Sequence, residues 1–269
     1  MRQEADLVPY DTTRLTGSPL LALAPHPDDE VFGCAAVTLE ATRRGADLHI
    51  VVVTDGSAQG EVEARRQESR AAADVLGTNE PEFWGFDDRG LEAVMPELVD
   101  RITAEIQSCR PQLVLTPSPA ELHPDHRAVG LATYRVLRNL PGITGAAGFR
   151  LAAYEVSAFL RPNTLVDLSH DWPTIRKAAR KFASQNVVRP YLEVLEALAT
   201  ARRLTLPESV THAAGFFVVD GPFIKAQGTR AWAEHIGPTA GLELDDPAAG
   251  APPASRSWLN RLLGRNAGD

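Results

Sequence analysis

Short apolar runs alternate with longer stretches whose apolar residues recur at helical spacing. The runs that predict strands in the first half of the chain are 20–24, 47–56, 81–86 and 112–119. The stretches that predict helices are 31–45, 62–77, 95–109 and 123–140. Strands separated by helices of this length indicate βαβ units. The pattern therefore predicts an α/β fold with a mostly parallel sheet and helices on both faces.

The pattern is weaker after Pro141. Further strands are predicted at 149–156, 164–169 and 213–221, and a helix at 174–185. We divide the chain into an N-terminal extension (1–17), one α/β domain (18–239) and a flexible Pro/Ala-rich tail (240–269). The tail ends in WLNRLLGR, which predicts a short amphipathic helix able to touch a membrane surface or a partner. A frayed terminus is the alternative interpretation.

Composition and charge narrow the class of protein. The 269 residues are 44% hydrophobic, enough for a sizeable core, and carry a net charge of −8, which argues against nucleic acid as a partner. Two cysteines, Cys34 and Cys109, are too few for a disulfide framework and are expected to be buried free thiols. We find no signal peptide and no apolar run of the ~18 residues that a membrane span needs. A cytoplasmic location is therefore expected.

Two charged motifs follow the first and fourth predicted strands. HPDDE occupies 26–30 and HPDH occupies 123–126. In parallel α/β sheets, ligands bind beyond the carboxyl ends of the strands, which is where both motifs fall. In each motif a proline fixes the backbone at a helix start. Residues three apart can then face one point, as His26 with Asp29 and His123 with His126.

These residue types are those of a catalytic zinc site. Two histidines and one carboxylate with an open coordination position bind zinc, and zinc brings the pKa of its water down to about 7. The motifs offer more candidates than three ligands require. A remaining acid, such as Asp28, can deprotonate the water, and a remaining histidine, oriented by Asp125, can stabilise an oxyanion. The alternative is that the aspartates are helix caps beside surface histidines. The occurrence of both motifs at strand ends favours the metal site.

The motifs APHPDDEVFGCAA and HPDHRAVG resemble the LmbE-like, PIG-L family of zinc-dependent N-acetylglucosaminyl deacetylases, over about residues 18–220. The resemblance implies a Rossmann-like fold and hydrolysis of an acetamide on a sugar. By motif position it implies that His26, Asp29 and His126 bind the metal. It also implies that Asp28 is the general base and that His123 stabilises the oxyanion. Zinc is the expected metal, and ferrous iron could replace it in the cell.

Three softer matches concern substrate binding. Arg65 lies in a family-like R-x-x-E helix, although it could instead pair with Glu68 on the helix surface. Asp88 matches a D-x-x-L turn whose acid binds sugar hydroxyls, with Asp87 as the competing choice. Phe216 lies in a late strand where the family often has A-E-x-F and is expected to line the pocket. Ala214 stands where glutamate is expected, a departure that bears on the substrate more than on the chemistry.

The function that we expect is removal of acetyl from the amide of an N-acetylglucosamine-type conjugate, with a metal-bound water as nucleophile. The partner is then a small-molecule glycoside. One alternative is an amidase that acts on another amide. Ferrous oxygenases also use two histidines and a carboxylate, but only the ligand count favours them. The last alternative is a non-catalytic metal- or sugar-binding module, although the first strand is not followed by GxGxxG. The sequence does not indicate an oligomeric state.

Overall fold

A computed structural model describes residues 8–238 of the chain. Within them a seven-stranded sheet has the order β3-β2-β1-β4-β5-β7-β6. Its strands are β1 (Leu20–Ala24), β2 (Leu48–Thr54), β3 (Glu82–Phe86), β4 (Leu113–Pro117), β5 (Arg150–Tyr154), β6 (Thr164–Asp167) and β7 (Ala213–Asp220). Neighbours from β3 to β5 are parallel, whereas β7 runs antiparallel to both β5 and β6. The predicted mostly parallel α/β fold is therefore confirmed.

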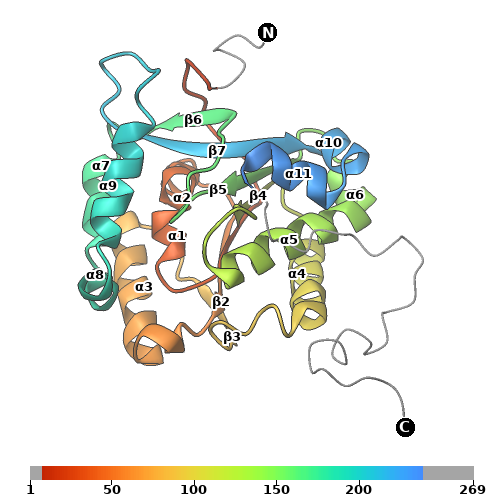
Figure 1. Cartoon of the computed structure of the whole chain (residues 1–269), viewed down its shortest axis with the longest axis horizontal. Helices are drawn as coiled ribbons and strands as arrows, with labels where there is room; N and C mark the ends of the chain where they lie inside the picture. Colours follow the sequence, from red (N-terminus) through yellow and green to blue (C-terminus); the bar gives the residue numbers. More distant parts are fainter. Residues whose placement is uncertain (1–7, 239–269) are drawn as a thin grey trace.

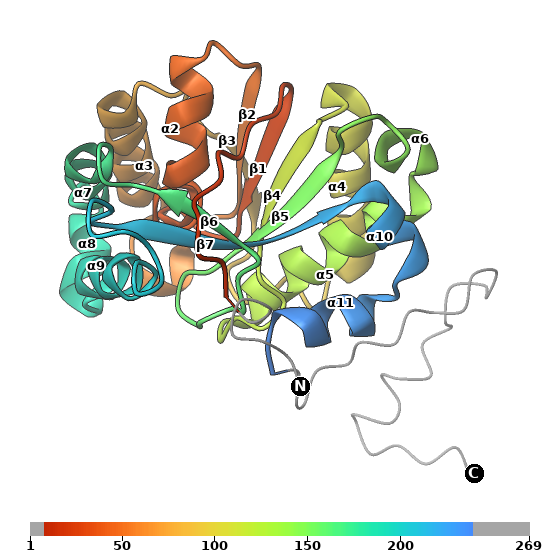
Figure 2. The same ribbon diagram turned by 90° about the horizontal axis from the view of Figure 1, so that it is seen from above.

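Helices cover both faces of the sheet (Figures 1 and 2). One face carries α1 (Asp29–Phe32), α2 (Ala35–Arg43), α3 (Val62–Leu76), α7 (Trp172–Ala179), α8 (Ala183–Val188) and α9 (Tyr191–Ala201). The other carries α4 (Met95–Cys109), α5 (Pro124–Asn139), α6 (Pro141–Thr144), α10 (Gly221–Ala226) and α11 (Thr229–Ile236). A short 3-10 helix, η2 (Ser57–Gln59), follows β2.

The central strand β1 explains why the sheet needs helices on both sides. Leu20 and Ala22 belong to the apolar core beneath α2, whereas Leu21 and Leu23 belong to the core beneath α5. Successive side chains of a strand point to opposite faces of the sheet. A strand that is apolar throughout therefore needs helices packed on both faces. All five β1 residues are buried. The run LLALA therefore specifies the middle of a two-faced sheet.

Two predicted helices are interrupted. The helix expected at 31–45 is divided into α1 and α2, which are separated by Gly33 and Cys34. Gly33 packs against the ring of Tyr154, where an added Cβ would lie 2.2 Å from a ring carbon, so the helical segment meets β5 at van der Waals distance. The helix expected at 174–185 ends at Ala179, and α8 begins at Ala183. Helices α9, α10 and α11 were not predicted.

The structure describes part of the predicted N-terminal extension and none of the predicted tail. Of the predicted N-terminal extension, residues 8–17 are described and lie along the β6 edge of the sheet (Figure 1), where Thr13 N donates to Leu165 O at 2.7 Å. Leu15 is buried in the core. The predicted tail, 240–269, lies outside the described residues.

Candidate metal centre and its cavity

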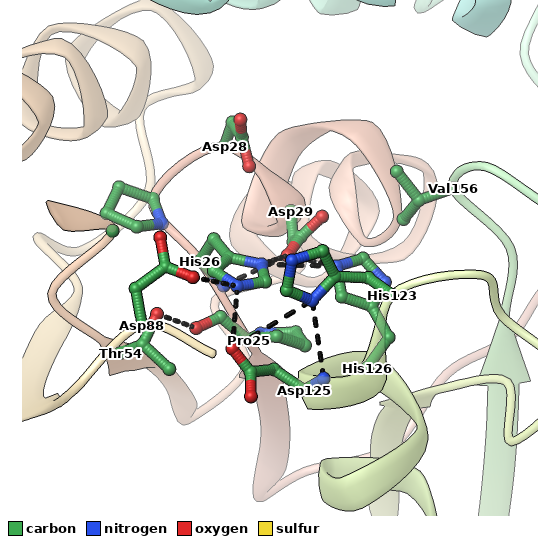
Figure 3. Close-up of polar contacts among 12 residues, drawn as sticks. Pro25, His26, Asp28, Asp29, Thr54, Asp88, His123, Asp125, His126 and Val156 are labelled. Carbon is green, nitrogen blue, oxygen red and sulfur yellow. Dashed lines mark hydrogen bonds and ion pairs between the residues drawn. The ribbon is translucent and has the colours of Figure 1, made fainter. Parts of the chain in front are cut away.

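The adjacency of β1 and β4 brings the two charged motifs together. The strands are parallel neighbours, with Leu20 opposite Leu113 and Ala22 opposite Leu115. Parallel neighbours end at the same edge of the sheet, so the loop after β1 and the loop after β4 meet there. Figure 3 shows the side chains of both motifs facing one another at this edge.

Three side chains form a tight triangle of ligand atoms. His26 Nδ1 lies 3.2 Å from Asp29 Oδ2 and 3.2 Å from His126 Nε2. His126 Nε2 lies 3.0 Å from the same Asp29 oxygen. All three residues are buried. Around a tetrahedral zinc ion with bonds of roughly 2.0–2.2 Å, ligand atoms are about 3.3–3.6 Å apart. The spacing of this triangle, 3.0–3.2 Å, is slightly shorter and close enough for one divalent cation to be bound by all three atoms.

The second ring nitrogen of His26 faces carboxylates. Nε2 is 3.2 Å from Asp125 Oδ2 and 3.3 Å from Asp88 Oδ1. These contacts favour a proton on Nε2, which leaves the lone pair of Nδ1 directed into the triangle with Asp29 and His126. A second grouping of His26, Asp88, His123 and Asp125 also has metal-binding residue types. A proton on Nε2 of His26 would favour the triangle over this second grouping, with Asp88 and Asp125 orienting the ring.

The electrostatics around the triangle also fit a cation. Burial alone would lower the pKa of His26, but Asp125, Asp29 and Asp88 more than offset it and raise that pKa well above its ordinary value. Burial alone would raise the pKa of Asp29, but His126 and His26 hold it well below its usual range. The carboxylate is therefore ionised, and positive charge is favoured beside it. A divalent cation would supply that charge.

Asp28 has a strained backbone beside the triangle. Its φ of 139° is a conformation that residues other than glycine rarely adopt. The Glu30 carboxylate accepts from Asp28 N at 2.8 Å, and the Arg65 guanidinium donates to Pro27 O at 2.7 Å and to Asp28 Oδ2 at 3.1 Å. Burial, reinforced by the charge of Asp29, raises the pKa of Asp28 well above its ordinary value. A carboxylate with a raised pKa is a better proton acceptor at neutral pH.

The guanidinium of Arg65 makes its hydrogen bonds to other groups of the protein. It is buried and also donates to Gly56 O at 2.9 Å. The alternative pair with Glu68 does not form. Glu68 instead accepts from the backbone N and the hydroxyl of Ser184, at 2.8 and 2.7 Å. Arg65 still lines the cavity, but its contacts make it a support for Asp28.

His123 lies beside His26, with the two rings edge to face and their centroids 4.5 Å apart. We expected the Asp125 carboxylate to orient His123, but the structure places it closer to His26. Asp125 Oδ2 is 3.9 Å from His123 Nδ1 but 3.2 Å from His26, and its oxygens also accept from the backbone N of Arg89 and of Leu91. These donors draw the carboxylate towards His26.

The pKa of His123 is lowered to about 4. Partial burial is the main cause, and the neighbouring His26 and His126 add to it. At neutral pH the His123 ring is therefore uncharged and can still donate one N–H. Hydrogen bonds from neutral groups also stabilise oxyanions. The lowered pKa therefore removes the charge of His123 but leaves its ability to donate a hydrogen bond.

Of the remaining residues predicted from the sequence, some lie at the site and others lie outside it. Asp88 lies at the site, while Asp87 is exposed. Phe216 is fully buried in the core and does not line the cavity beside the metal centre. Ala214 lies on the same strand and likewise lines no part of that cavity. The departure from the family pattern at Ala214 therefore falls outside the cavity walls.

A cavity of about 570 Å³ opens over the triangle. Its floor is polar, with Asp28, His123 and Asp88. The other walls are largely apolar and contain Phe32, Leu122, Val156, Pro190, Tyr191 and Val194. Much of this apolar wall comes from α9 and the segment before it, which sequence reasoning missed because no motif marks it. Within residues 8–238, every helix is too short or too polar to cross a lipid bilayer.

Comparison with known proteins agrees with this geometry. Residues 21–137 match the family model described as PIG-L: GlcNAc-PI de-N-acetylase, a segment that contains both motifs. The chain is also 29% identical over 202 residues to the diacetylchitobiose deacetylase of Thermococcus kodakarensis, covering 65% of this chain and 75% of that protein.

Solved structures share the fold. The N,N'-diacetylchitobiose deacetylase of Pyrococcus horikoshii, complexed with an inhibitor, superposes with a TM-score of 0.63 at 23% identity, covering 77% of this chain and 85% of that one. The 4-carboxy-2-hydroxymuconate hydratase of Pseudomonas putida KT2440 superposes with a TM-score of 0.57 at 19% identity, covering 74% and 95%. The fold by itself thus accommodates more than one reaction. The match over both motifs adds what the fold alone does not give: residues 21–137 carry a domain similar to PIG-L (LmbE-like) proteins, and the curated relatives of the chain include deacetylases of GlcNAc-type substrates.

Proposed function

We propose that this protein is a metal-dependent hydrolase that removes the acetyl group from the amide of an N-acetylglucosamine-type conjugate, releasing acetate and an amine. The observation that carries the proposal is the triangle of His26, Asp29 and His126 at the floor of a cavity, with Asp28 beside it. The match of residues 21–137 to a de-N-acetylase family model and the diacetylchitobiose deacetylase relative support the choice of an acetylated amino sugar.

The metal would be held by His26 Nδ1, Asp29 Oδ2 and His126 Nε2. A mixed nitrogen and oxygen donor set of this kind suits zinc, and ferrous iron is the alternative. When bound, the ion acts as a Lewis acid that acidifies water and polarises the amide carbonyl. Asp88 and Asp125 keep the lone pair of His26 Nδ1 directed at the ion by holding Nε2.

Asp28 and His123 carry the proton chemistry in this proposal. Asp28 accepts the proton of the attacking water, which its raised pKa favours, and later delivers a proton to the leaving amine. His123 donates a ring N–H to the oxygen of the tetrahedral intermediate. Glu30 and Arg65 hold Asp28 in the backbone conformation that places it beside the triangle.

The cavity suits a glycoside with a second moiety. Its volume of about 570 Å³ is within the range of small-molecule sites, and Asp88 can accept hydrogen bonds from sugar hydroxyls. We propose zinc as the metal and the cytoplasm as the location. Two unpaired, buried cysteines are compatible with a reducing compartment. Hydrolysis of another amide is the variant of this proposal that the substrate panel below examines.

The experiment is to measure acetate release from a panel of N-acetylglucosamine conjugates and other acetamides. Metal-stripped protein is assayed before and after addition of Zn²⁺ or Fe²⁺. We expect release that depends on the metal and on an acetylated amino sugar. Release only from an acetamide that lacks a sugar would contradict the proposed substrate class.

A variant separates catalysis from binding. Asp28→Asn is expected to retain the metal and to lose turnover by on the order of 10²- to 10⁴-fold, because the amide cannot accept the proton. Asp87→Asn, at an exposed acid outside the cavity, is the matched control and should remain active. Wild-type protein that binds metal and sugar with no turnover of any member would indicate a binding module instead.

A further inference from the structure

One buried acid next to the metal centre has no part in the mechanism described above. Glu121 lies in the loop between β4 and α5, two residues before His123, and is only 2% exposed. A buried carboxylate is costly unless it is paired and hydrogen-bonded. Its partners therefore indicate what the acid is for.

The carboxylate of Glu121 is bound by the segment that follows β5. Oε1 accepts from Val156 N at 2.6 Å and from Ala158 N at 3.3 Å. Oε2 accepts from the Ser157 hydroxyl at 2.5 Å and from Ser157 N at 3.1 Å. Both oxygens of Glu121 thus act as hydrogen-bond acceptors, which is the role of a carboxylate, and these donors hold the group in one position.

This carboxylate faces a metal ligand. Glu121 Oε2 lies 3.8 Å from His126 Nδ1, the ring nitrogen on the side away from the triangle. His126 Nδ1 is buried and has no hydrogen-bond partner among the described residues. At 3.8 Å the contact is electrostatic rather than a hydrogen bond. It still favours a proton on Nδ1, because an N–H directed at a carboxylate is attractive whereas a lone pair there is repulsive.

We infer that Glu121 is a positioning residue for His126. By keeping the proton on Nδ1, it leaves the lone pair on Nε2, the atom that lies 3.0 Å from Asp29 and 3.2 Å from His26 in the triangle. Carboxylates that orient metal-bound histidines in this way commonly set metal affinity. The inference rests on the proposed metal centre.

The same carboxylate joins the ligand to the cavity wall. Val156 and Ser157, whose backbone N–H groups bind Glu121, both line the cavity. One buried carboxylate therefore holds the substrate-facing wall on one side and the metal ligand on the other.

The test uses the full chain, stripped of metal and titrated with Zn²⁺ against a competing chelator. Glu121→Gln keeps the size of the side chain and removes its charge. We expect zinc affinity to fall by about 10- to 100-fold. In the metal-free variant, the nitrogen NMR shifts of the His126 ring should show a gain of the tautomer protonated at Nε2. Unchanged affinity together with unchanged tautomer populations would overturn the inference.

Ser157→Ala is the matched control. It removes a hydroxyl that binds Glu121 but leaves the charge facing His126 in place. If Glu121 only fastened the wall, both variants would lose thermal stability and neither would change zinc affinity. The inference instead requires that Glu121→Gln alone changes the affinity and the tautomer.

Two further outcomes are distinguishable. If Glu121→Gln fails to fold, Glu121→Asp carries the same test, because the shorter side chain moves the charge away from Nδ1. It should bind zinc more weakly than the wild type, and equal binding would contradict the inference. A wild-type chain that binds no zinc would contradict the metal centre itself, and the role of Glu121 with it.

Discussion

At the scale of single residues, the conformation of Asp28 is the most demanding feature of the site. For a residue other than glycine, a backbone φ of 139° raises the free energy of the folded state by of order 1–3 kcal/mol. Contacts with the surrounding residues must offset this strain. Glu30 and Arg65 supply that support through the backbone and the side chain of Asp28 and through Pro27 O. In the proposed mechanism, the motif HPDDE therefore includes two residues that would hold the metal, His26 and Asp29. Asp28 would accept a proton, and Glu30 maintains the geometry.

Arg65 offers a test of this account. Arg65→Lys keeps the charge but loses the planar, forked donor geometry that binds Gly56 O, Pro27 O and Asp28 together. We expect kcat to fall on the order of 10- to 100-fold because Asp28 is misplaced, while KM changes little. Steady-state kinetics with the substrate identified by the acetate assay measure both constants.

The control is Arg66→Lys, on the same helix. Its guanidinium lies over the ring of Phe83, 5.4 Å from the ring centroid and outside the cavity, so turnover should be unaffected. A rise in KM at constant kcat for Arg65→Lys would mean that Arg65 binds the substrate directly, as the sequence predicted, and that its support of Asp28 is secondary.

At the scale of elements, the interruption between α1 and α2 shows why a helix pattern does not predict where a helix breaks. Residues 31–45 have helical periodicity throughout, but Gly33 lies against Tyr154, whose hydroxyl donates to Leu23 O at 2.7 Å. The close approach of β5 to the helical segment depends on a contact across more than a hundred residues. No local pattern encodes it.

A contact between α3 and α8 helps to hold the wall formed by α8 and α9. Glu68 binds both the backbone N and the hydroxyl of Ser184 at the start of α8. Glu68→Ala removes this cap, at a cost of about 1 kcal/mol. We expect faster hydrogen exchange of amides in 183–190 and a raised KM, because Gln185 and Tyr191 on these helices line the cavity.

Glu63→Ala is the corresponding control on α3. Glu63 is exposed and pairs with Arg70, away from the cavity. Its removal should leave both the exchange of 183–190 and KM as in the wild type. Equal exchange rates in Glu68→Ala and wild-type protein would show that α8 is held by its apolar packing rather than by the cap.

At the scale of the whole molecule, the two cysteines lie in the two separate cores. Cys34 is in the core beneath α2, and Cys109 is in the core beneath α4. The prediction that both are buried and free is confirmed. Burial raises the pKa of Cys109 to about 12 and that of Cys34 well above its usual value, so neither is a thiolate at neutral pH.

We therefore expect both thiols to resist an aromatic disulfide reagent at neutral pH in the folded protein. Reactivity depends on the thiolate, and neither side chain is accessible. In increasing denaturant both should become reactive over the same range, since one sheet supports both cores. The release of the coloured thiolate, with peptide mapping of the modified sites, measures this. Exposure of Cys109 well before Cys34 would show that the face with α4 and α5 opens independently.

Much of the architecture follows from the sequence alone. The unbroken apolar runs specify strands buried on both faces, and the intervening periodicity specifies the helices that cover them, because both signals are local and repeat along the chain. The helices at 62–76, 95–109 and 124–139 lie where the pattern predicts. The motifs HPDDE and HPDH could likewise be placed at strand ends.

The partners of the site residues were decided only by the tertiary structure. His26 shares its two ring nitrogens between the triangle and the pair Asp88 and Asp125, and Asp125 turns from His123 towards it. Phe216, expected in the cavity, lies in the core. Local pattern determines which face of an element is apolar. The choice among carboxylates for one imidazole depends on how distant loops pack, and that is settled only when β1 and β4 lie side by side.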